Sequence, residues 1–171
     1  MENLKSYIRN IPDFPKPGIL FYDITTLLRD PSGFRESIDS LATPFANDAI
    51  DLVVGIESRG FIFGAPVADR LEAGFVPIRK PNKLPSTTIQ MRYELEYGQG
   101  SLEIHDDAIE KGQKVLIVDD LLATGGTAQA AVQLIKKLGG IVQGVVFLIE
   151  LEGLKGRSKL IDEKIVSILK Y

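Results

Sequence analysis

Two adjacent acids followed by a loop of small residues form the stretch of this sequence with the clearest chemistry. Asp119 and Asp120 follow the apolar run 115–118, and a loop rich in glycine and threonine leads from them to a helix expected from Thr127. Glycine lets the backbone approach a ligand closely, and the free N–H groups and dipole of a helix start attract phosphate. Ionised carboxylates accept hydrogen bonds, so they suit the vicinal hydroxyls of a sugar, directly or through a hydrated Mg²⁺. The stretch therefore predicts a pocket for a sugar phosphate.

Within this pocket the two acids are expected to bind the ribose hydroxyls. The phosphate is expected on the loop, at Ala123, Thr124, Gly125, Gly126 and Thr127. The alternative is that the glycine pair is only a tight turn and the acids only a helix N-cap, but the combination of acids, threonines and strand disfavours it. The loop is not a Walker A motif, because the Gly-Lys-Ser/Thr ending is absent, and no complete G-x-G-x-x-G fingerprint occurs in the chain.

Cations that could bind phosphate groups occur in two other segments. Arg79, Lys80 and Lys83 lie within five residues, in a segment that two prolines stiffen. Arg59 follows the apolar run 52–56, so it is expected in the same crevice as the two acids. The guanidinium of an arginine in a crevice that holds a diphosphate can donate a bidentate pair of hydrogen bonds to it. The alternatives are a solvated charged face for the first segment and a surface salt bridge for Arg59.

The elements that must position these residues are short apolar strands alternating with helices. Apolar runs predict buried strands at 52–56, 75–79, 115–118, 145–149 and 165–169. Apolar residues at helical spacing predict helices over 34–45, 63–73 and 127–138, and Pro44 leaves the end of the first helix open. Continuous apolar strands alternating with helices indicate a mainly parallel sheet covered on both faces. Ligands bind beyond the carboxyl ends of such strands, which is where the two acids lie.

Two segments depart from this alternation. From Ile89 to Tyr97, and again from Leu102 to Ile104, apolar and polar residues alternate with a period of two. Because Gly98-Gln99-Gly100 separates the two runs, we expect a β-hairpin that projects from the domain or lies over one edge. Three prolines within residues 11–18 exclude a helix there and indicate an ordered loop.

The composition is that of a globular protein, and it excludes several function classes. The 171 residues suffice for one domain with a full core, and a net charge of −3 argues against a protein that coats nucleic acid. The absence of cysteine and the single histidine, His105, exclude a disulfide, a thiol nucleophile and a metal site of cysteines and histidines within one chain. No secretory signal pattern and no membrane-spanning run occur, so we expect a cytoplasmic protein without a membrane partner.

The stretch from Val115 to Thr127 resembles the phosphoribosyl-pyrophosphate signature of the type I phosphoribosyltransferases, and the likeness extends over nearly the whole chain. The other segments resemble the adenine-specific branch of that family. Residues 14–25 resemble its base-binding segment, and residues 57–61 its pyrophosphate loop. Residues 79–85 resemble its basic segment, and residues 95–98 its flexible catalytic loop.

The resemblance implies a fold and a domain organisation. The fold is that of the type I phosphoribosyltransferases: an α/β fold with a mainly parallel central β-sheet flanked by helices on both faces, a flexible β-hairpin loop and a small N-terminal hood. Residues 1–171 are expected to form a single domain, with a base-binding segment at 1–30 and the flexible hairpin loop at 86–105.

The implied reaction is transfer of 5-phosphoribose from phosphoribosyl pyrophosphate to adenine, giving AMP and pyrophosphate, a step of purine salvage. Mg²⁺ is the implied cofactor, held mainly through the substrate rather than by metal ligands of the protein, and a homodimer is implied as well. Three rivals are a phosphoribosyltransferase for guanine or hypoxanthine, a nucleotide-sensing regulator without turnover, and a sugar-phosphate binding module. The N-terminal segment argues against the first, and the loop around Glu96 favours catalysis over the other two.

By resemblance, pyrophosphate binds Glu57, Ser58, Arg59, Arg79, Lys80 and Lys83, and a cis peptide is expected between the first two of these residues. The resemblance also makes Glu96 the acid or base that exchanges a proton with a ring nitrogen of adenine. Tyr97 is expected to help close the loop over the substrates and so exclude water from the ribosyl centre. The period-two pattern alone would instead make Glu94 and Glu96 the wet face of the hairpin.

By resemblance, adenine is recognised by backbone groups near Leu20, Phe21 and Tyr22. Backbone C=O and N–H groups can match the amino group and a ring nitrogen of adenine, whereas a 6-oxo purine presents the opposite donor pattern and leaves them unpaired. Some relatives carry arginine where this chain has Tyr22, so the resemblance implies only a backbone contact there. Phe21 could stack on the base or belong to the core.

Overall fold

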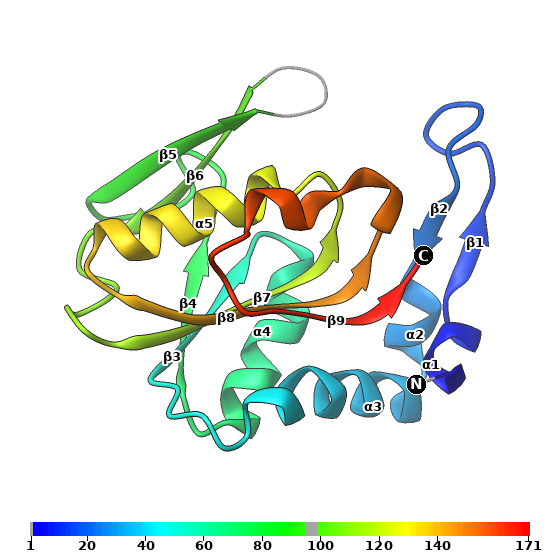
Figure 1. The fold of residues 1–171 in the computed structure, drawn as a ribbon, viewed down its shortest axis with the longest axis horizontal. Coiled ribbons are helices and arrows are strands. Elements are labelled where there is room, and N and C mark those ends of the chain that lie inside the picture. The colour runs from blue at the N-terminus through cyan, green and yellow to red at the C-terminus, as the bar shows by residue number, and fades with distance from the viewer. Residues whose placement is uncertain (1, 95–98) are drawn as a thin grey trace.

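The computed structural model describes residues 2–94 and 99–171, and its centre is a five-stranded parallel sheet (Figure 1). The strand order is β4 (Gly74–Ile78), β3 (Leu52–Ile56), β7 (Lys114–Leu122), β8 (Ile141–Glu150) and β9 (Ile165–Lys170). All four neighbouring pairs are parallel, which confirms the predicted sheet. The structure extends β7 and β8 beyond their apolar cores, and β7 includes both acids.

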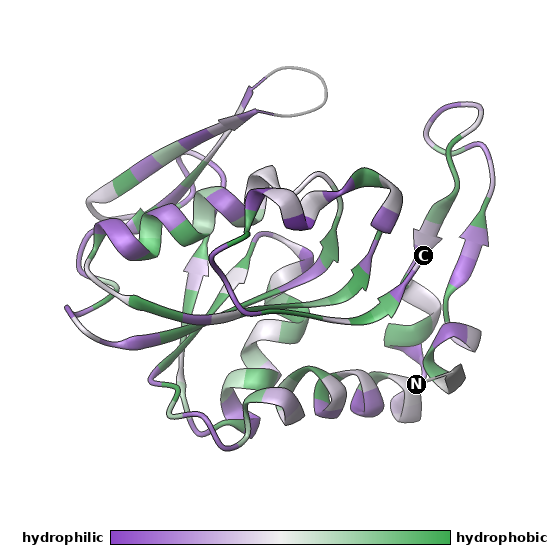
Figure 2. Cartoon of the chain, in the orientation of Figure 1, coloured by the Kyte–Doolittle hydropathy of each residue, from purple (hydrophilic) through white to green (hydrophobic). Residues whose placement is uncertain are grey.

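The sheet is buried on both faces because its strands send alternate side chains to two separate cores. In β7, Val115 and Ile117 pack with α5 (Gly126–Lys137), whereas Leu116 and Val118 pack with the helices of the other face. That second layer contains α3 (Pro31–Ala42) and α4 (Arg59–Arg70) (Figure 1). Figure 2 shows the apolar colour concentrated along the central strands, whereas the helices carry both apolar and polar residues. This explains why the strands read as continuous apolar runs in the sequence.

The observed helices differ from the predicted ones mainly at their ends. α3 begins three residues earlier than expected, because the carboxylate of Asp30 accepts hydrogen bonds from the N–H groups of Ser32 and Gly33 and caps it. It gives way to a 3₁₀ turn over Thr43–Phe45, which contains Pro44. α4 begins at Arg59 rather than Phe63, since the helix starts immediately after the loop that follows β3, before its apolar pattern is visible.

The two smaller sheets confirm the hood and the hairpin. β1 (Arg9–Ile11) and β2 (Phe21–Asp23) pair antiparallel on one side of the molecule, flanked by α1 (Glu2–Ser6) and α2 (Thr25–Arg29). β5 (Thr88–Glu94) and β6 (Gln99–His105) form the predicted hairpin above α5. An antiparallel bridge between Arg79 and Glu103 ties this hairpin to the residue after β4.

The chain after β8 makes two 3₁₀ turns, over Glu152–Leu154 and Gly156–Lys159, before it enters β9. These turns lie beside the start of α5 (Figure 1). In residues 2–94 and 99–171, no helix is long and apolar enough to cross a membrane.

The hood is held together by the carboxylate of Asp23. It accepts hydrogen bonds from the N–H and hydroxyl groups of Thr25, at 2.9 and 2.8 Å, and pairs with Arg9 across the two strands. The backbone N–H of Thr25 and the guanidinium of Arg9 lower the pKa of Asp23 to about 2. The carboxylate is therefore charged at neutral pH and links β1, β2 and the start of α2.

We expect Asp23→Asn to loosen the hood. The neutral amide loses charge-assisted hydrogen bonds, so the free energy of unfolding should fall by about 1–2 kcal/mol. The loss is no larger because Arg9 is exposed to solvent, which weakens its ion pair with Asp23. Thermal and urea denaturation at pH 7 would measure the loss. The control is Asp107→Asn, which changes an exposed acid outside the hood and should alter stability by less than about 0.5 kcal/mol. Equal stability of the two variants would contradict this role.

Candidate active site

The carboxyl ends of β3 and β7 form the centre of the candidate site. The strands are neighbours, with Gly55 paired to Val118, so the residues that follow each strand emerge side by side. As a result the Nε atom of Arg59, at the start of α4, lies 3.1 Å from a carboxylate oxygen of Asp120. The sequence prediction that this arginine shares a crevice with the acids is confirmed.

A glycine at the start of α4 lets the helix approach the first acid closely. A Cβ atom on Gly60 would lie 2.9 Å from an Oδ atom of Asp119 and 3.0 Å from the carbonyl oxygen of Val118. Real Cβ contacts are not this short, so any other residue would push α4 away from β7. Gly60 therefore fixes the distance between Arg59 and the acid pair.

The two acids lie in a setting that disfavours charge. Burial raises the pKa of Asp119 well above its ordinary range, and the neighbouring charge of Asp120 adds to the rise. Burial raises the pKa of Asp120 as well, although the guanidinium of Arg59 opposes this. The N–H of Asp120 donates to the Asp119 carboxylate at 2.9 Å. Ligand hydroxyls or a cation would relieve the electrostatic cost of placing two carboxylates together.

The loop after the acids surrounds a small cavity of about 80 Å³. Gly125 occupies the N-cap of α5 with φ = 79°, and a Cβ atom there would lie 2.4 Å from the carbonyl oxygen of Gly156. Both the backbone conformation and the available space therefore require glycine. The lining residues are Asp119, Leu121, Leu122, Ala123, Thr124, Gly125, Thr127 and Ala128. Five of the seven residues predicted for ribose 5-phosphate belong to this lining; Asp120 and Gly126 do not.

A second, more apolar cavity of about 100 Å³ lies between the hood and the sheet. Its lining residues are Ile19, Leu20, Phe21, Tyr22, Arg59, Asp120, Leu121, Ile149 and Leu151. All three residues predicted for adenine are among them, and so is Asp120, one of the two acids. Sequence reasoning missed the apolar wall from Ile149 and Leu151, and also Ile19, which is 45% exposed like Leu20. Such exposed apolar side chains in a loop were the available signal.

Phe21 and Tyr22, whose side-chain roles the sequence left open, each contact another aromatic ring. The ring of Phe21 meets the ring of Phe14 edge to face, with centroids 5.2 Å apart. The ring of Tyr22 lies 4.0 Å from that of Tyr171 at the C-terminus. The side chain of Tyr22 is thus engaged with Tyr171, which leaves its backbone as the part available to a base.

The predicted pyrophosphate residues form a compact ion cluster around Glu57. This carboxylate, with a side chain 8% exposed, accepts from the Lys83 ammonium at 2.5 Å, from Arg79 Nε at 3.2 Å and from the N–H of Lys80 at 3.1 Å. Burial alone would raise the pKa of Glu57, but these three donors outweigh it and lower the pKa to about 2. The peptide between Glu57 and Ser58 is cis, as the resemblance implied.

This cluster assigns Glu57 a different chemistry from its neighbours. A carboxylate repels a diphosphate, so its contact with the cations is the role that the geometry supports. Lys80 contributes its backbone N–H, while its side chain is exposed. The contacts of Ser58, Arg59, Arg79, Lys80 and Lys83 with a diphosphate stay predictions.

Glu96 and Tyr97 lie outside the described residues, so their predicted roles stay predictions. The strand that leads to them ends beside the phosphate loop. A Cβ atom on Gly126 would lie 2.8 Å from the carbonyl oxygen of Glu94 and 3.4 Å from the ring of Tyr93. The hairpin thus brings the chain to the start of α5 immediately before residue 95.

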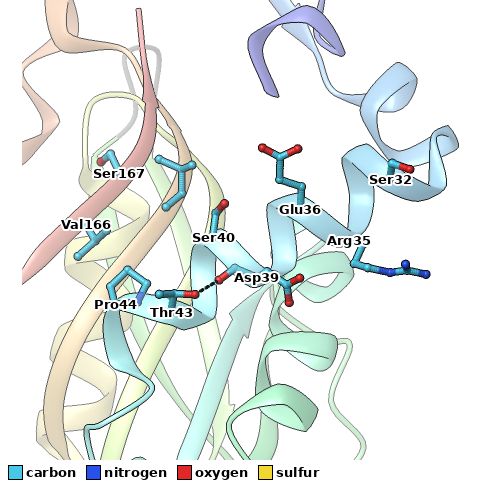
Figure 3. Close-up of a pocket in the computed structure, with 10 residues that line it drawn as sticks. Ser32, Arg35, Glu36, Asp39, Ser40, Thr43, Pro44, Val166 and Ser167 are labelled. Carbon is cyan, nitrogen blue, oxygen red and sulfur yellow. Dashed lines mark hydrogen bonds between the residues drawn. The ribbon is translucent and has the colours of Figure 1, made fainter. Parts of the chain in front are cut away.

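A larger cavity, of about 730 Å³, lies elsewhere, between α3 with its following turn and the edge strand β9 (Figure 3). Its lining residues are Ser32, Arg35, Glu36, Asp39, Ser40, Thr43, Pro44, Val166, Ser167 and Ile168. Figure 3 shows Ser40 and Thr43 on the α3 side of this space and Val166 and Ser167 on the β9 side. None of these residues lines either of the two cavities at the acid pair. The candidate active site is therefore identified by its residues and not by the volume of its cavities.

We expect the Glu57 cluster to make the stability of the protein depend on acid pH. Folding lowers the pKa of Glu57 from 4.5 to about 2, so its stabilisation is present above about pH 4.5 and is lost as the pH falls towards 2. Glu57→Gln should lower the free energy of unfolding by about 1–3 kcal/mol at pH 7 and by much less near pH 2.5. Urea denaturation of both proteins at the two pH values measures this. A deficit that stays constant with pH would contradict it.

Comparisons with known proteins agree with this geometry. The family model of the phosphoribosyl transferase domain matches residues 26–169. The adenine phosphoribosyltransferase of Koribacter versatilis is 60% identical over 170 residues, which cover 99% of this chain and 93% of the relative. That of Acidobacterium capsulatum is 59% identical, over 99% of this chain and 94% of the relative.

Solved structures of the same enzyme are also similar. The structure from Thermoanaerobacter pseudethanolicus has a TM-score of 0.96 at 55% identity and covers 99% of each chain. The Saccharomyces cerevisiae enzyme, solved with adenine and an imino-altritol bisphosphate, has a TM-score of 0.92 at 43% identity over 98% of this chain and 97% of that one. The chain therefore belongs to the phosphoribosyl transferase family, and within it to the adenine phosphoribosyltransferases.

Proposed function

We propose that the crevice at the ends of β3 and β7 carries out the reaction of this enzyme, in which 5-phosphoribose passes from phosphoribosyl pyrophosphate to N9 of adenine. The single observation that carries the proposal is that consecutive residues of β7 line the two cavities. Asp119 lines the loop cavity, Asp120 lines the hood cavity, and Leu121 lines both. A nucleotide with its phosphate in one cavity and its base in the other must cross the acids with its ribose.

The loop supplies donors for the 5-phosphate. Its backbone N–H groups and the N-terminus of α5 carry partial positive charge, which favours a bound phosphate. Thr124 and Thr127 add hydroxyl donors. These groups are fixed before the ligand arrives, because Gly125 is wedged against Gly156. Little ordering is then needed on binding, which favours affinity.

The acid pair accepts the two ribose hydroxyls. When ionised, Asp119 and Asp120 would also place negative charge beside the ribosyl carbon, where positive charge develops as the bond to pyrophosphate breaks. Burial raises the pKa of both acids, and the hydroxyls and cation of a bound substrate would stabilise their charged form. Catalysis by such a site is largely positional and electrostatic.

The cations around Glu57 receive the leaving pyrophosphate. Arg79 and Lys83 are held by Glu57 at the edge of the crevice, and Arg59 is held by Asp120 inside it. A diphosphate carries more charge than either carboxylate, so it can compete for these donors without a large movement of the chain. Ser58 and Lys80 complete the set by their place in the same two loops.

We infer that Mg²⁺ enters this site with the substrate. In residues 2–94 and 99–171 no group of three His, Cys, Asp or Glu side chains could hold a metal ion. Asp119 and Asp120 supply hard oxygen atoms, which suit Mg²⁺ or its bound waters. When bound with the substrate, Mg²⁺ would neutralise charge on the leaving pyrophosphate.

Adenine occupies the hood cavity in this proposal. Leu20 and the backbone of Tyr22 line one side, and Ile149 and Leu151 line the other. As N9 of adenine forms its bond to the ribosyl carbon, the bond to pyrophosphate breaks and the proton on the imidazole ring must leave. Glu96 takes this proton, and Tyr97 helps to close the loop over the substrates. The end of β5 beside Gly126 supports this placement of the loop.

The assembly and location belong to the same proposal. We infer a homodimer in the cytoplasm, without nucleic acid or membrane as a partner. The net charge of −3 supports the absence of a nucleic-acid surface.

The direct test measures pyrophosphate release with phosphoribosyl pyrophosphate and Mg²⁺, offering adenine, guanine, hypoxanthine and uracil in separate assays. Adenine alone should support turnover, because the other bases present a different donor pattern to fixed backbone groups. Glu96→Gln should slow adenine turnover by about 10²–10⁴-fold, the usual contribution of a general acid or base. The matched control is Glu94→Gln, whose exposed side chain lies two residues away and should change the rate by less than about threefold.

Turnover of a 6-oxo purine at a comparable rate would contradict the assignment of the hood cavity. If Glu96→Gln left the rate of adenine turnover unchanged, the proposed reaction would stand but Glu96 would not be its acid or base. Binding of phosphoribosyl pyrophosphate without turnover of any base would contradict catalysis and favour a regulator.

A further inference from the structure

We propose that Lys159 is an additional ligand of the 5-phosphate group, reaching the start of α5 from the turn Gly156–Lys159. The inference rests on the proposed function, because it concerns the phosphate carried by both phosphoribosyl pyrophosphate and AMP. No sequence pattern near Asp119 or the glycine pair points to this lysine, which lies 32 residues after Thr127.

The turn forms the outer wall of the phosphate loop. A Cβ atom on Gly156 would lie 2.3 Å from the carbonyl oxygen of Ala123 and 3.1 Å from the N atom of Gly125. The corresponding atom on Gly125 would lie 2.4 Å from the carbonyl oxygen of Gly156. Two backbones are thus in direct contact, with a glycine required on each side. Any movement of the turn would be transmitted to the loop.

An ion pair between Arg157, which is partly exposed, and the buried carboxylate of Glu150 anchors the turn to the sheet. The guanidinium of Arg157 donates a fork to both carboxylate oxygens of Glu150, at 2.7 and 2.8 Å, and a further hydrogen bond to Ser167 Oγ at 3.2 Å. Glu150 is 4% exposed and ends β8, and Ser167 lies in β9. Burial alone would raise the pKa of Glu150, but Arg157 and Ser167 outweigh it and lower the pKa. The pair therefore stays charged at neutral pH.

The backbone of Lys159 is held at both ends by these contacts. Gly156 lies against the loop, and Leu160, 2% exposed, packs in the core beneath α5. The lysine side chain starts from a fixed point, so its ammonium can reach only a limited region.

The region that the ammonium occupies is the start of α5. Its Nζ atom lies 3.7 Å from the position of a Cβ atom on Gly126, the first residue of that helix. The same position lies 2.8 Å from the carbonyl oxygen of Glu94, so the ammonium, the start of α5 and the end of β5 lie near one another. Across residues 2–94 and 99–171, no carboxylate forms an ion pair with Lys159.

This position is electrostatically unfavourable until an anion arrives. The start of a helix carries partial positive charge, so a cation there is repelled rather than attracted. A phosphate on the loop would reverse the sign of the interaction, because it would bring negative charge to the helix start, beside the ammonium. The flexible stem of lysine allows the small adjustment that direct contact requires.

The test compares Lys159→Met with Lys137→Met in the full-length enzyme. Lys137 is exposed at the other end of α5, eleven residues after Gly126 and so about 16 Å along the helix, and its loss changes the net charge equally. Lys159→Met should raise the Kd for AMP and the KM for phosphoribosyl pyrophosphate about tenfold. The KM for adenine, which has no phosphate, should stay within twofold. Lys137→Met should leave all three within twofold, and Lys159→Arg should restore most of the AMP affinity.

Three results would overturn the inference. The first is a Kd for AMP within twofold of the parent in Lys159→Met. The second is an equal rise in the KM for adenine, which would indicate a general structural effect. The third is an equal loss of AMP affinity in Lys137→Met, which would indicate net charge alone. In each case the parent enzyme still converts adenine, so the proposed function stands. A parent enzyme without adenine turnover would instead overturn the proposed function.

Discussion

The parallel pairing of β3 with β7 is the constraint on which the rest of the site depends. Its register sets Gly55 opposite Val118, so the loop and helix that follow β3 begin beside the two acids that end β7. Arg59 then meets Asp120, and Gly60 touches Asp119. A shift by one residue would reverse which side chains of β7 face each core, so burial on both faces enforces the register. The hydrophobic core thereby determines the geometry of the polar site.

Close backbone contacts carry that geometry from the sheet to the ligand-binding loops. Gly60 sets the approach of α4 to β7, and Gly125 sets the approach of the phosphate loop to the turn at Gly156. The charged groups then fall into two kinds. Donors around Glu57 and Glu150 keep these carboxylates ionised, whereas burial raises the pKa of Asp119 and of Asp120. Buried acids with raised pKa values in a crevice are typical of a site that binds a polar ligand.

The sequence predicted what depends on local pattern and missed what depends on distant contact. Uniform apolar runs predicted all five strands of the sheet, and period-two alternation predicted the hairpin. The start of α4 was missed because Arg59 and Gly60 carry no apolar signal, and both residues are there for contacts with β7. The partners of Glu57 lie more than 20 residues away, and Gly156 lies about 30 residues from the loop that it supports, so no spacing rule could connect them. The resemblance, rather than the pattern, supplied the roles of Glu96 and the hood.

The central claim is that one nucleotide spans the two cavities across the acid pair. A crystal structure of the enzyme with AMP tests it most directly. The account predicts the phosphate on residues 123–127, the ribose hydroxyls within hydrogen-bond distance of Asp119 and Asp120, and the base between the hood and Leu151. AMP bound with its base outside the hood cavity, or with its ribose away from both acids, would contradict it.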